Sequence, residues 1–404
     1  MRTSIVRAAL AVLILPASAG AQSLSLTEAE ALARLSPASP YVRAQRAAVD
    51  AARAEAAAAG RWPNPRATVN REAAAGVTEY ITTVTQPLPV TGRLGLDVAA
   101  AAARADAVSS RSDELLRRIR AHLRLAFAAL VEAQAREREL EAAAARLREL
   151  ADVLARREAA GDAAGFDWLR AEREALDAEA DRAAAAVARA HAQGDLAAFF
   201  ENPGRALDVV AVVEPRVPTP LPPLDMLVER ALSTRDELRA LEHEADSARL
   251  DERSAERRRY PEPEIVAGTK TSTAGDIGGV LAVHASIPLF DRFGPARAAA
   301  RARAARAEAD SEVFRAALVA EIAALRATVV ERRAASDRYR ASEASTAELE
   351  RIAQISYDAG ERSILELLDA YRTGAAARVR QAELDGAARQ AGIELAFASG
   401  WEIE

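Results

Sequence analysis

The sequence predicts a mainly α-helical protein built by duplication of one long-helix unit, in which each copy also carries a β-hairpin. Half of the 404 residues are apolar but only 4% are aromatic, so alanine is abundant and large core side chains are scarce. Glycine and proline together make up about 9% of the chain, against about 12% in average proteins. Long helices are therefore expected, and landmarks that recur about 200 residues apart indicate the duplication.

Charge and cysteine content exclude several function classes. The net charge of −6 argues against a surface devoted to nucleic acid. The chain has no cysteine, which excludes a disulfide framework, a thiolate metal site and a cysteine nucleophile.

The N-terminal 21 residues have the pattern of a secretory signal peptide. Arg2 and Arg7 precede a short apolar run that ends at Leu15, and Ala19-Gly20-Ala21 fits the cleavage rule. We expect cleavage near Gln22 and no lipid anchor, because no cysteine follows. No later stretch has the run of about 18 uncharged apolar residues that a spanning helix needs, so any membrane crossing would use strands.

The duplication is carried by short motifs that recur at intervals of 198 to 201 residues. Arg61-Trp62-Pro63-Asn64-Pro65 returns as Arg259-Tyr260-Pro261-Glu262-Pro263, and Ala160-Gly161 returns as Ala359-Gly360. Pro87-Leu88 likewise returns as Pro288-Leu289. We therefore expect one repeat over 22–200, a proline-rich linker over 201–223, and a second repeat over 224–404.

Each repeat is expected to contain one very long helix, because glycine and proline are absent from Asp97 to Ala159 and from Ala296 to Ala359. Such helices would be roughly 95 Å long. Apolar residues follow coiled-coil spacing along both of them, at Ile119, Leu123, Ala126, Leu130, Leu140, Leu147, Leu154, Phe314, Leu318, Ile322, Leu325 and Val329. Shorter helices are expected over 41–59, 166–193 and 224–259, and from 364 onward. Periodicity alone favours a structural coiled coil over a channel wall.

A strand-like segment precedes each long helix. Hairpins are expected over 66–86, with strands 66–74 and 77–86, and over 264–287, with strands 264–273 and 277–287. Each run has about the length that a tilted strand needs to cross a bilayer. Trp62 and Tyr260 precede the hairpins and would suit a membrane interface, whereas Arg71 interrupts the apolar face of the first strand. A soluble hairpin capping a coiled coil is the alternative. Four strands cannot close a barrel, so insertion would require chains to pool strands.

In the order and duplicated spacing of these motifs, the chain resembles the TolC family of outer-membrane efflux channels, the outer membrane factors. The resemblance covers essentially all of the chain after residue 21. It implies a homotrimer whose helices form a periplasmic α-barrel tunnel and whose hairpins form a shared 12-stranded β-barrel. Arg61-Trp62-Pro63-Asn64-Pro65 and the segment from Gln86 to Arg93 look closest to the CzcC-like branch for heavy-metal cations.

The resemblance also implies a gate at the periplasmic tip. Tyr357 and Arg362 would latch onto Asp167, and Glu366 and Asp369 would form acidic rings. Glu366 stands where the family more often has aspartate. Gly161 and Gly360 would end the long helices in left-handed caps at turns that contact an adaptor. On residue type alone, Glu366 and Asp369 would instead be solvated charges on a surface helix.

Enzymatic motifs are absent from the sequence, and no cofactor or metal is expected. It has no glycine-rich phosphate loop and no His-Glu-x-x-His motif, and its four histidines are scattered. The resemblance implies a passive outer-membrane conduit that works with a periplasmic adaptor and an inner-membrane pump of the RND type, embedded in outer-membrane lipid and independent of nucleic acid. A periplasmic adaptor or a trimeric structural coiled coil without a pore are the competing interpretations. The cargo is not specified by the sequence.

Overall fold

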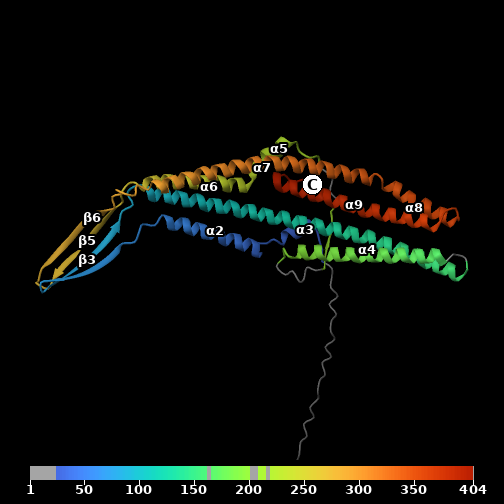
Figure 1. The fold of residues 1–404 in the computed structure, drawn as a ribbon, viewed down its shortest axis with the longest axis horizontal. Coiled ribbons are helices and arrows are strands. Elements are labelled where there is room, and N and C mark those ends of the chain that lie inside the picture. The colour runs from blue at the N-terminus through green and yellow to red at the C-terminus, as the bar shows by residue number, and fades with distance from the viewer. Residues whose placement is uncertain (1–23, 162–164, 201–207, 215–218, 404) are drawn as a thin grey trace, which may run out of the picture.

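The computed structural model describes residues 24–161, 165–200, 208–214 and 219–403. The molecule is elongated, with a β-sheet at one end and two turns that connect helices at the other (Figure 1). The expected signal peptide lies outside the described residues. Among the described helices, none is both long and apolar enough to span a membrane.

The helices form two series of similar layout. The first repeat contains α1 (Glu28–Ala33), α2 (Pro40–Ala59), α3 (Arg93–Ala159) and α4 (Gly165–Ala197). The second contains α5 (Leu224–Thr234), α6 (Asp236–Arg257), α7 (Gly294–Arg340), α8 (Glu343–Asp358) and α9 (Ile364–Ser399). Helix α3 has 67 residues, which corresponds to about 100 Å, so the first long helix is confirmed.

Helix α3 lies at the centre of the packing. It contacts α2 and α4, which follow each other along one side, and α6 and α9, which follow each other along another (Figure 1). Helix α7 covers α6 and α9, and α8 packs on α9. Three separate apolar clusters hold these layers, and the residues predicted from coiled-coil spacing supply much of them, including Leu123, Leu130, Leu147, Leu154, Leu318, Ile322 and Val329.

The second long helix is not continuous, contrary to the sequence-based expectation. The chain bends between α7 and α8, at Ala341 and Ser342 (Figure 1). The hydroxyl of Ser342 donates to the carbonyl of Tyr339 at 2.6 Å, and its amide bonds the same carbonyl at 3.0 Å. Serine side chains compete in this way with the regular helical ladder, which explains a break without glycine or proline.

The predicted helix over 224–259 is also divided. Arg235 separates α5 from α6 with an extended backbone conformation (ψ 116°). Its buried guanidinium lies 3.0 Å from Glu114 of α3 and donates to the carbonyl of Phe397 near the end of α9 at 3.0 Å. Burial raises the pKa of Glu114 and lowers that of Arg235, despite their mutual attraction. Arg235 therefore links the junction between α5 and α6 to both α3 and α9.

The two hairpins join into one antiparallel four-stranded sheet with the order β2-β3-β5-β6. Its strands are β2 (Arg66–Ala74), β3 (Val77–Pro87), β5 (Pro263–Ser272) and β6 (Ile277–Ala285), so the predicted limits hold within two residues. Ala75 and Gly76 have φ of 48° and 83°, which is the conformation that a two-residue hairpin turn requires. Strands β2 and β6 remain open edges of the sheet in the single chain.

A second, smaller pairing was not predicted. Strand β1 (Leu24–Leu26) pairs in parallel with β4 (Val209–Ala211), which belongs to the expected linker. Gln193 of α4 donates to the carbonyl of Val209 at 2.8 Å and fixes this pair to the helices. Part of the proline-rich connector is therefore integrated into the fold.

Candidate functional site

The two faces of the four-stranded sheet differ sharply in chemistry. The register places all of its exposed large hydrophobic residues on one face, here called the apolar face: Val69, Tyr80, Val84, Ile265, Ile277, Leu281 and Val283. The opposite, polar face carries Arg66, Glu72, Glu79, Glu264, Lys270 and His284. Two cross-strand ion pairs lie there, Arg66 with Glu264 at 2.9 Å and Lys270 with Glu79 at 2.7 Å. Such a sheet suits an apolar medium on one side and water on the other.

The predicted interface aromatics lie where the sheet meets the helices. Trp62 is 60% exposed and precedes β2, and Tyr260 is 44% exposed and precedes β5. The side chain of Arg259 stacks 4.7 Å from the Tyr260 ring centroid and donates to its hydroxyl. Both aromatic residues are thus at the same end of the sheet.

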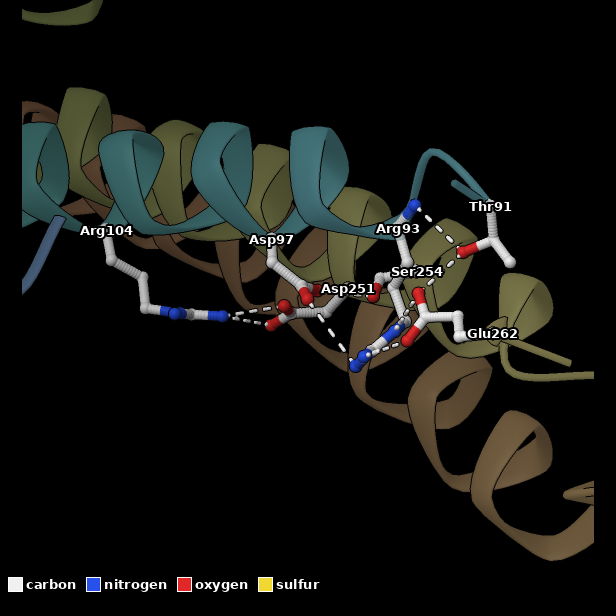
Figure 2. Close-up of polar contacts among 7 residues, drawn as sticks. All are labelled: Thr91, Arg93, Asp97, Arg104, Asp251, Ser254 and Glu262. Atoms are coloured by element: carbon white, nitrogen blue, oxygen red, sulfur yellow. Dashed lines mark hydrogen bonds and ion pairs between the residues drawn. The ribbon is translucent and has the colours of Figure 1, made fainter. Parts of the chain in front are cut away.

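The repeated proline motifs connect the sheet to the helices. Arg93, the first residue of α3, pairs with Glu262 at 2.9 Å, and the hydroxyl of Thr91 donates to the same carboxylate at 2.8 Å (Figure 2). This pairing with Arg93 lowers the pKa of Glu262. In the first copy, Gln86 donates to the carbonyl of Pro63 at 3.0 Å. The motif residues that carry the family resemblance therefore orient the strands on the helical rods.

The contacts continue into the helical bundle. Arg93 lies 3.7 Å from Asp97, which accepts a hydrogen bond from Ser254 of α6 (Figure 2). Further along the same helices, Arg104 binds both carboxylate oxygens of Asp251, at 2.6 and 2.7 Å. The junction thus ties the first repeat to the second.

The opposite end of the molecule carries the two predicted tip turns. Gly161 and Gly360 have φ of 83° and 73°, as expected for left-handed caps. No atom lies within 4 Å of a β-carbon built on either glycine, so the backbone conformation rather than space favours glycine there. Residues 162–164 lie outside the described part of the first turn.

The five predicted gate residues lie near these turns, but not as one cluster. Burial, together with the negative charge of Asp167, raises the pKa of Tyr357. Arg362 pairs with Glu366 at 3.6 Å rather than with Asp167. Asp369 is exposed and makes no hydrogen bond or ion pair with the residues that the structure describes.

Glu366 has a structural role that the sequence analysis missed. Its carboxylate accepts a hydrogen bond from the amide of Ser363 at 3.0 Å, and the two residues form a capping box at the start of α9. The pattern Ser-x-x-Glu before an apolar run was the available signal. An acidic ring at Glu366 would therefore be built on the capped end of a helix.

A buried carboxylate behind the tip was also missed. Glu350 of α8 is 11% exposed and binds Arg146 of α3 at 2.7 Å and Arg378 of α9 at 3.0 Å. Arg378 also reaches Glu139 at 3.4 Å. This network joins the segment beyond the bend at Ser342 to the central helix. Sequence spacing gave no signal for it, because its members come from three helices.

Within the described residues, no group of three or more His, Asp or Glu side chains is arranged to hold a metal ion.

Comparisons with known proteins agree with this geometry. Residues 227–401 match the family model described as outer membrane efflux protein. No curated protein sequence matches the chain. Similar solved structures include a membrane protein from Pseudomonas aeruginosa, with a TM-score of 0.79, 20% identity, and coverage of 92% of this chain and 93% of that one.

Two further structures have nearly the same similarity. The outer membrane protein VceC from Vibrio cholerae has a TM-score of 0.78 and 18% identity, covering 93% of this chain and 97% of that one. The CmeC outer membrane channel of Campylobacter jejuni has a TM-score of 0.79 and 13% identity, covering 93% and 86%. The chain therefore has the fold of these outer-membrane proteins, and its second repeat carries the sequence pattern of the outer membrane efflux protein family.

Proposed function

We propose that this protein is the outer-membrane channel of a tripartite efflux system, a member of the TolC family. The observation that carries the proposal is the four-stranded sheet, with one apolar face, one charged face and two open edges, at the end of a helical bundle whose central helix is about 100 Å long. In water, open strand edges and an exposed apolar face favour aggregation. When copies join edge to edge in a membrane, the edge strands form hydrogen bonds with each other and the apolar face contacts lipid.

The proposed assembly is a homotrimer. Three copies would supply twelve strands to one barrel, with the apolar face toward lipid and the polar face toward the lumen. The helices would continue the passage through the periplasm, and the export signal would be the N-terminal 21 residues. A periplasmic adaptor or a pore-free coiled coil would leave the apolar face of the sheet exposed to water, so both alternatives are disfavoured.

The partners and cargo follow from the same proposal. The turns at Gly161 and Gly360 would meet a periplasmic adaptor, and exposed Phe166 and Leu365 beside them offer apolar contact area. The pump would be of the RND type. The sequence itself does not specify the cargo, and heavy-metal cations are proposed only because the motifs at Arg61 and Gln86 resemble those of the CzcC-like branch.

The gate is proposed at the tip. The charge of Asp167 acts on Tyr357 within one chain, and Arg362 could exchange its pairing with Glu366 for an aspartate of an adjacent copy. Exposed Glu366 and Asp369 would repeat around the threefold axis as acidic rings.

The test of the proposal is the mass and the conductance of the purified protein. In detergent it should be a trimer, and in planar bilayers it should form channels. A monomer that stays soluble without detergent and never conducts would reject the proposal.

A further inference from the structure

Arg71 is an exception among the charged residues of the sheet. All the other Arg, Lys, Asp and Glu side chains of the four strands lie on the polar face, whereas Arg71 lies on the apolar face. Arg66, on the same strand, is paired with Glu264. Arg71 makes no hydrogen bond or ion pair with the described part of the chain. Its cationic group is thus exposed and without a protein counter-charge.

The register gives Arg71 one notable neighbour. Tyr80 of β3 lies directly opposite it, and the same row continues through Thr271 and Ile277. Directly opposed side chains on one face have β-carbons about 5 Å apart, so the arginine and the 44% exposed tyrosine can contact one common group. Both side chains supply hydrogen-bond donors.

The position of this row along the strand places it at the far edge of the apolar band. Arg71 follows Trp62 by nine residues, which is about 30 Å of extended chain. A strand tilt of about 40° reduces this distance to about 23 Å along the membrane normal, close to the apolar band of about 25 Å in such sheets. Trp62 lies at the helical end, so Arg71 and Tyr80 lie at the opposite interface, away from the helices.

The strands of a second copy would offer no acidic side chain on the apolar face. In the proposed assembly the free edge of β2 would meet β6, whose apolar face carries Ile277, Gly279, Leu281, Val283 and Ala285. Asp276, in the adjoining turn, acts electrostatically on Lys270, which lies on the polar face. The apolar face of the sheet contains no acidic residue in any of its four strands.

We infer that Arg71 and Tyr80 form a binding site for the phosphate of a lipid in the outer leaflet. Guanidinium groups bind phosphate in bidentate geometry, and the pair is strengthened at the edge of a low-dielectric layer. An arginine facing lipid costs little near the interface, unlike at the bilayer centre. The site rests on the proposed function, because only membrane insertion brings a lipid phosphate to this row.

The test measures lipid retained by the full-length protein. Protein purified in detergent is incubated with bisphosphorylated lipid A, or with the same lipid lacking its phosphates, and the bound lipid is counted by native mass spectrometry. Arg71→Ala should retain about tenfold less phosphorylated lipid than wild type, and Arg71→Lys should be intermediate. Arg66→Ala, which removes a charge from the polar face of the same strand, should retain it like wild type.

Other outcomes decide against the site. Equal retention by wild type and Arg71→Ala, or equal retention of both lipids, would overturn it. Displacement of the lipid by millimolar inorganic phosphate would identify a free-anion site instead. Flotation with phosphatidylcholine vesicles and bilayer conductance test the channel function separately from the lipid site. If wild type inserts and conducts but retains both lipids equally, only the lipid site is refuted. A wild type that never inserts refutes both. If Arg71→Ala does not insert, Arg71→Gln takes its place in the comparison.

Discussion

The carboxylate of Glu350 occupies the space in which Gly374 would carry a β-carbon. Gly374 lies within α9, where glycine costs about 1 kcal/mol relative to alanine. The missing side chain lets Glu350 of α8 reach between helices to Arg146 and Arg378. The same arrangement recurs on α9 at Gly386, which accommodates the carboxylate of Glu132 of α3. Helical glycines here create room for carboxylates that reach between helices.

Substituting Gly374 with alanine should therefore destabilise the protein, although alanine is the better helix former. A β-carbon would displace Glu350, and overpacking of this kind costs about 1–3 kcal/mol. Gly194 of α4 is the matched control, since a β-carbon there meets no atom within 4 Å and should stabilise by about 0.5–1 kcal/mol. Melting temperatures of the detergent-purified variants provide the measurement. A Gly374→Ala protein as stable as Gly194→Ala would show that the Glu350 network does not hold α8.

The junction between sheet and helices should weaken in acid. The pKa of Glu262 is held below its ordinary value of 4.5 by Arg93, so the pair contributes stability above that pH. This contribution is lost as the pH falls through the lowered pKa. Glu262→Gln should melt lower than wild type at pH 7, and the difference should shrink toward pH 3. Glu256→Gln, an exposed change in the nearby helix α6, should not alter the pH dependence; a constant difference for Glu262→Gln would argue against the pairing.

The proposed gate predicts changes in single-channel current. Arg362→Ala and Tyr357→Phe should conduct more than wild type, because each would remove a contact of the proposed closed tip. A loss of about 1.4 kcal/mol would change the ratio of open to closed channels about tenfold. The measurement is conductance in planar bilayers, with Arg351→Ala as a control, since among the described residues Arg351 forms its ion pair within α8. Conductance that is unchanged in both tip variants would refute this gate.

The proposed acidic rings of Glu366 and Asp369 predict cation selectivity and block by multivalent cations. The double variant Glu366→Gln with Asp369→Asn should lose both properties. Glutamine is chosen because it can keep the capping box with Ser363, whereas alanine would also uncap α9. Reversal potentials in a salt gradient measure the selectivity. If the double variant keeps the selectivity of wild type, the charges that select ions lie elsewhere.

A substitution at Gly268 of β5 tests the packing of β5 against β3. A β-carbon there would meet the carbonyl oxygen of Thr82 and the backbone of Thr83 on β3, so Gly268→Ala should impair pairing of the two hairpins. Gly278→Ala on β6 has open space and should be tolerated. The amount of protein that floats with vesicles reports the effect, and equal insertion of the two variants would contradict this packing.

The hairpins could be predicted because their signals lie within short stretches of sequence. The hairpins were predicted within two residues because strand alternation and the turn at Ala75-Gly76 are both local. The break at Ser342 was missed because it depends on a hydroxyl competing for a carbonyl, without glycine or proline. The pairing of β1 with β4 and the network around Glu350 join residues far apart in sequence, and only packing brings them together.

The most direct test of the central claim uses the absence of native cysteine, which makes single-cysteine variants simple to label. His284 lies on the polar face of β6, and Leu281 lies on its apolar face and is 80% exposed. A charged, water-soluble thiol reagent added to bilayers should lower the conductance of His284→Cys channels and leave Leu281→Cys channels unchanged. The absence of channels, or block of Leu281→Cys with no effect on His284→Cys, would contradict a sheet that lines a pore with its polar face.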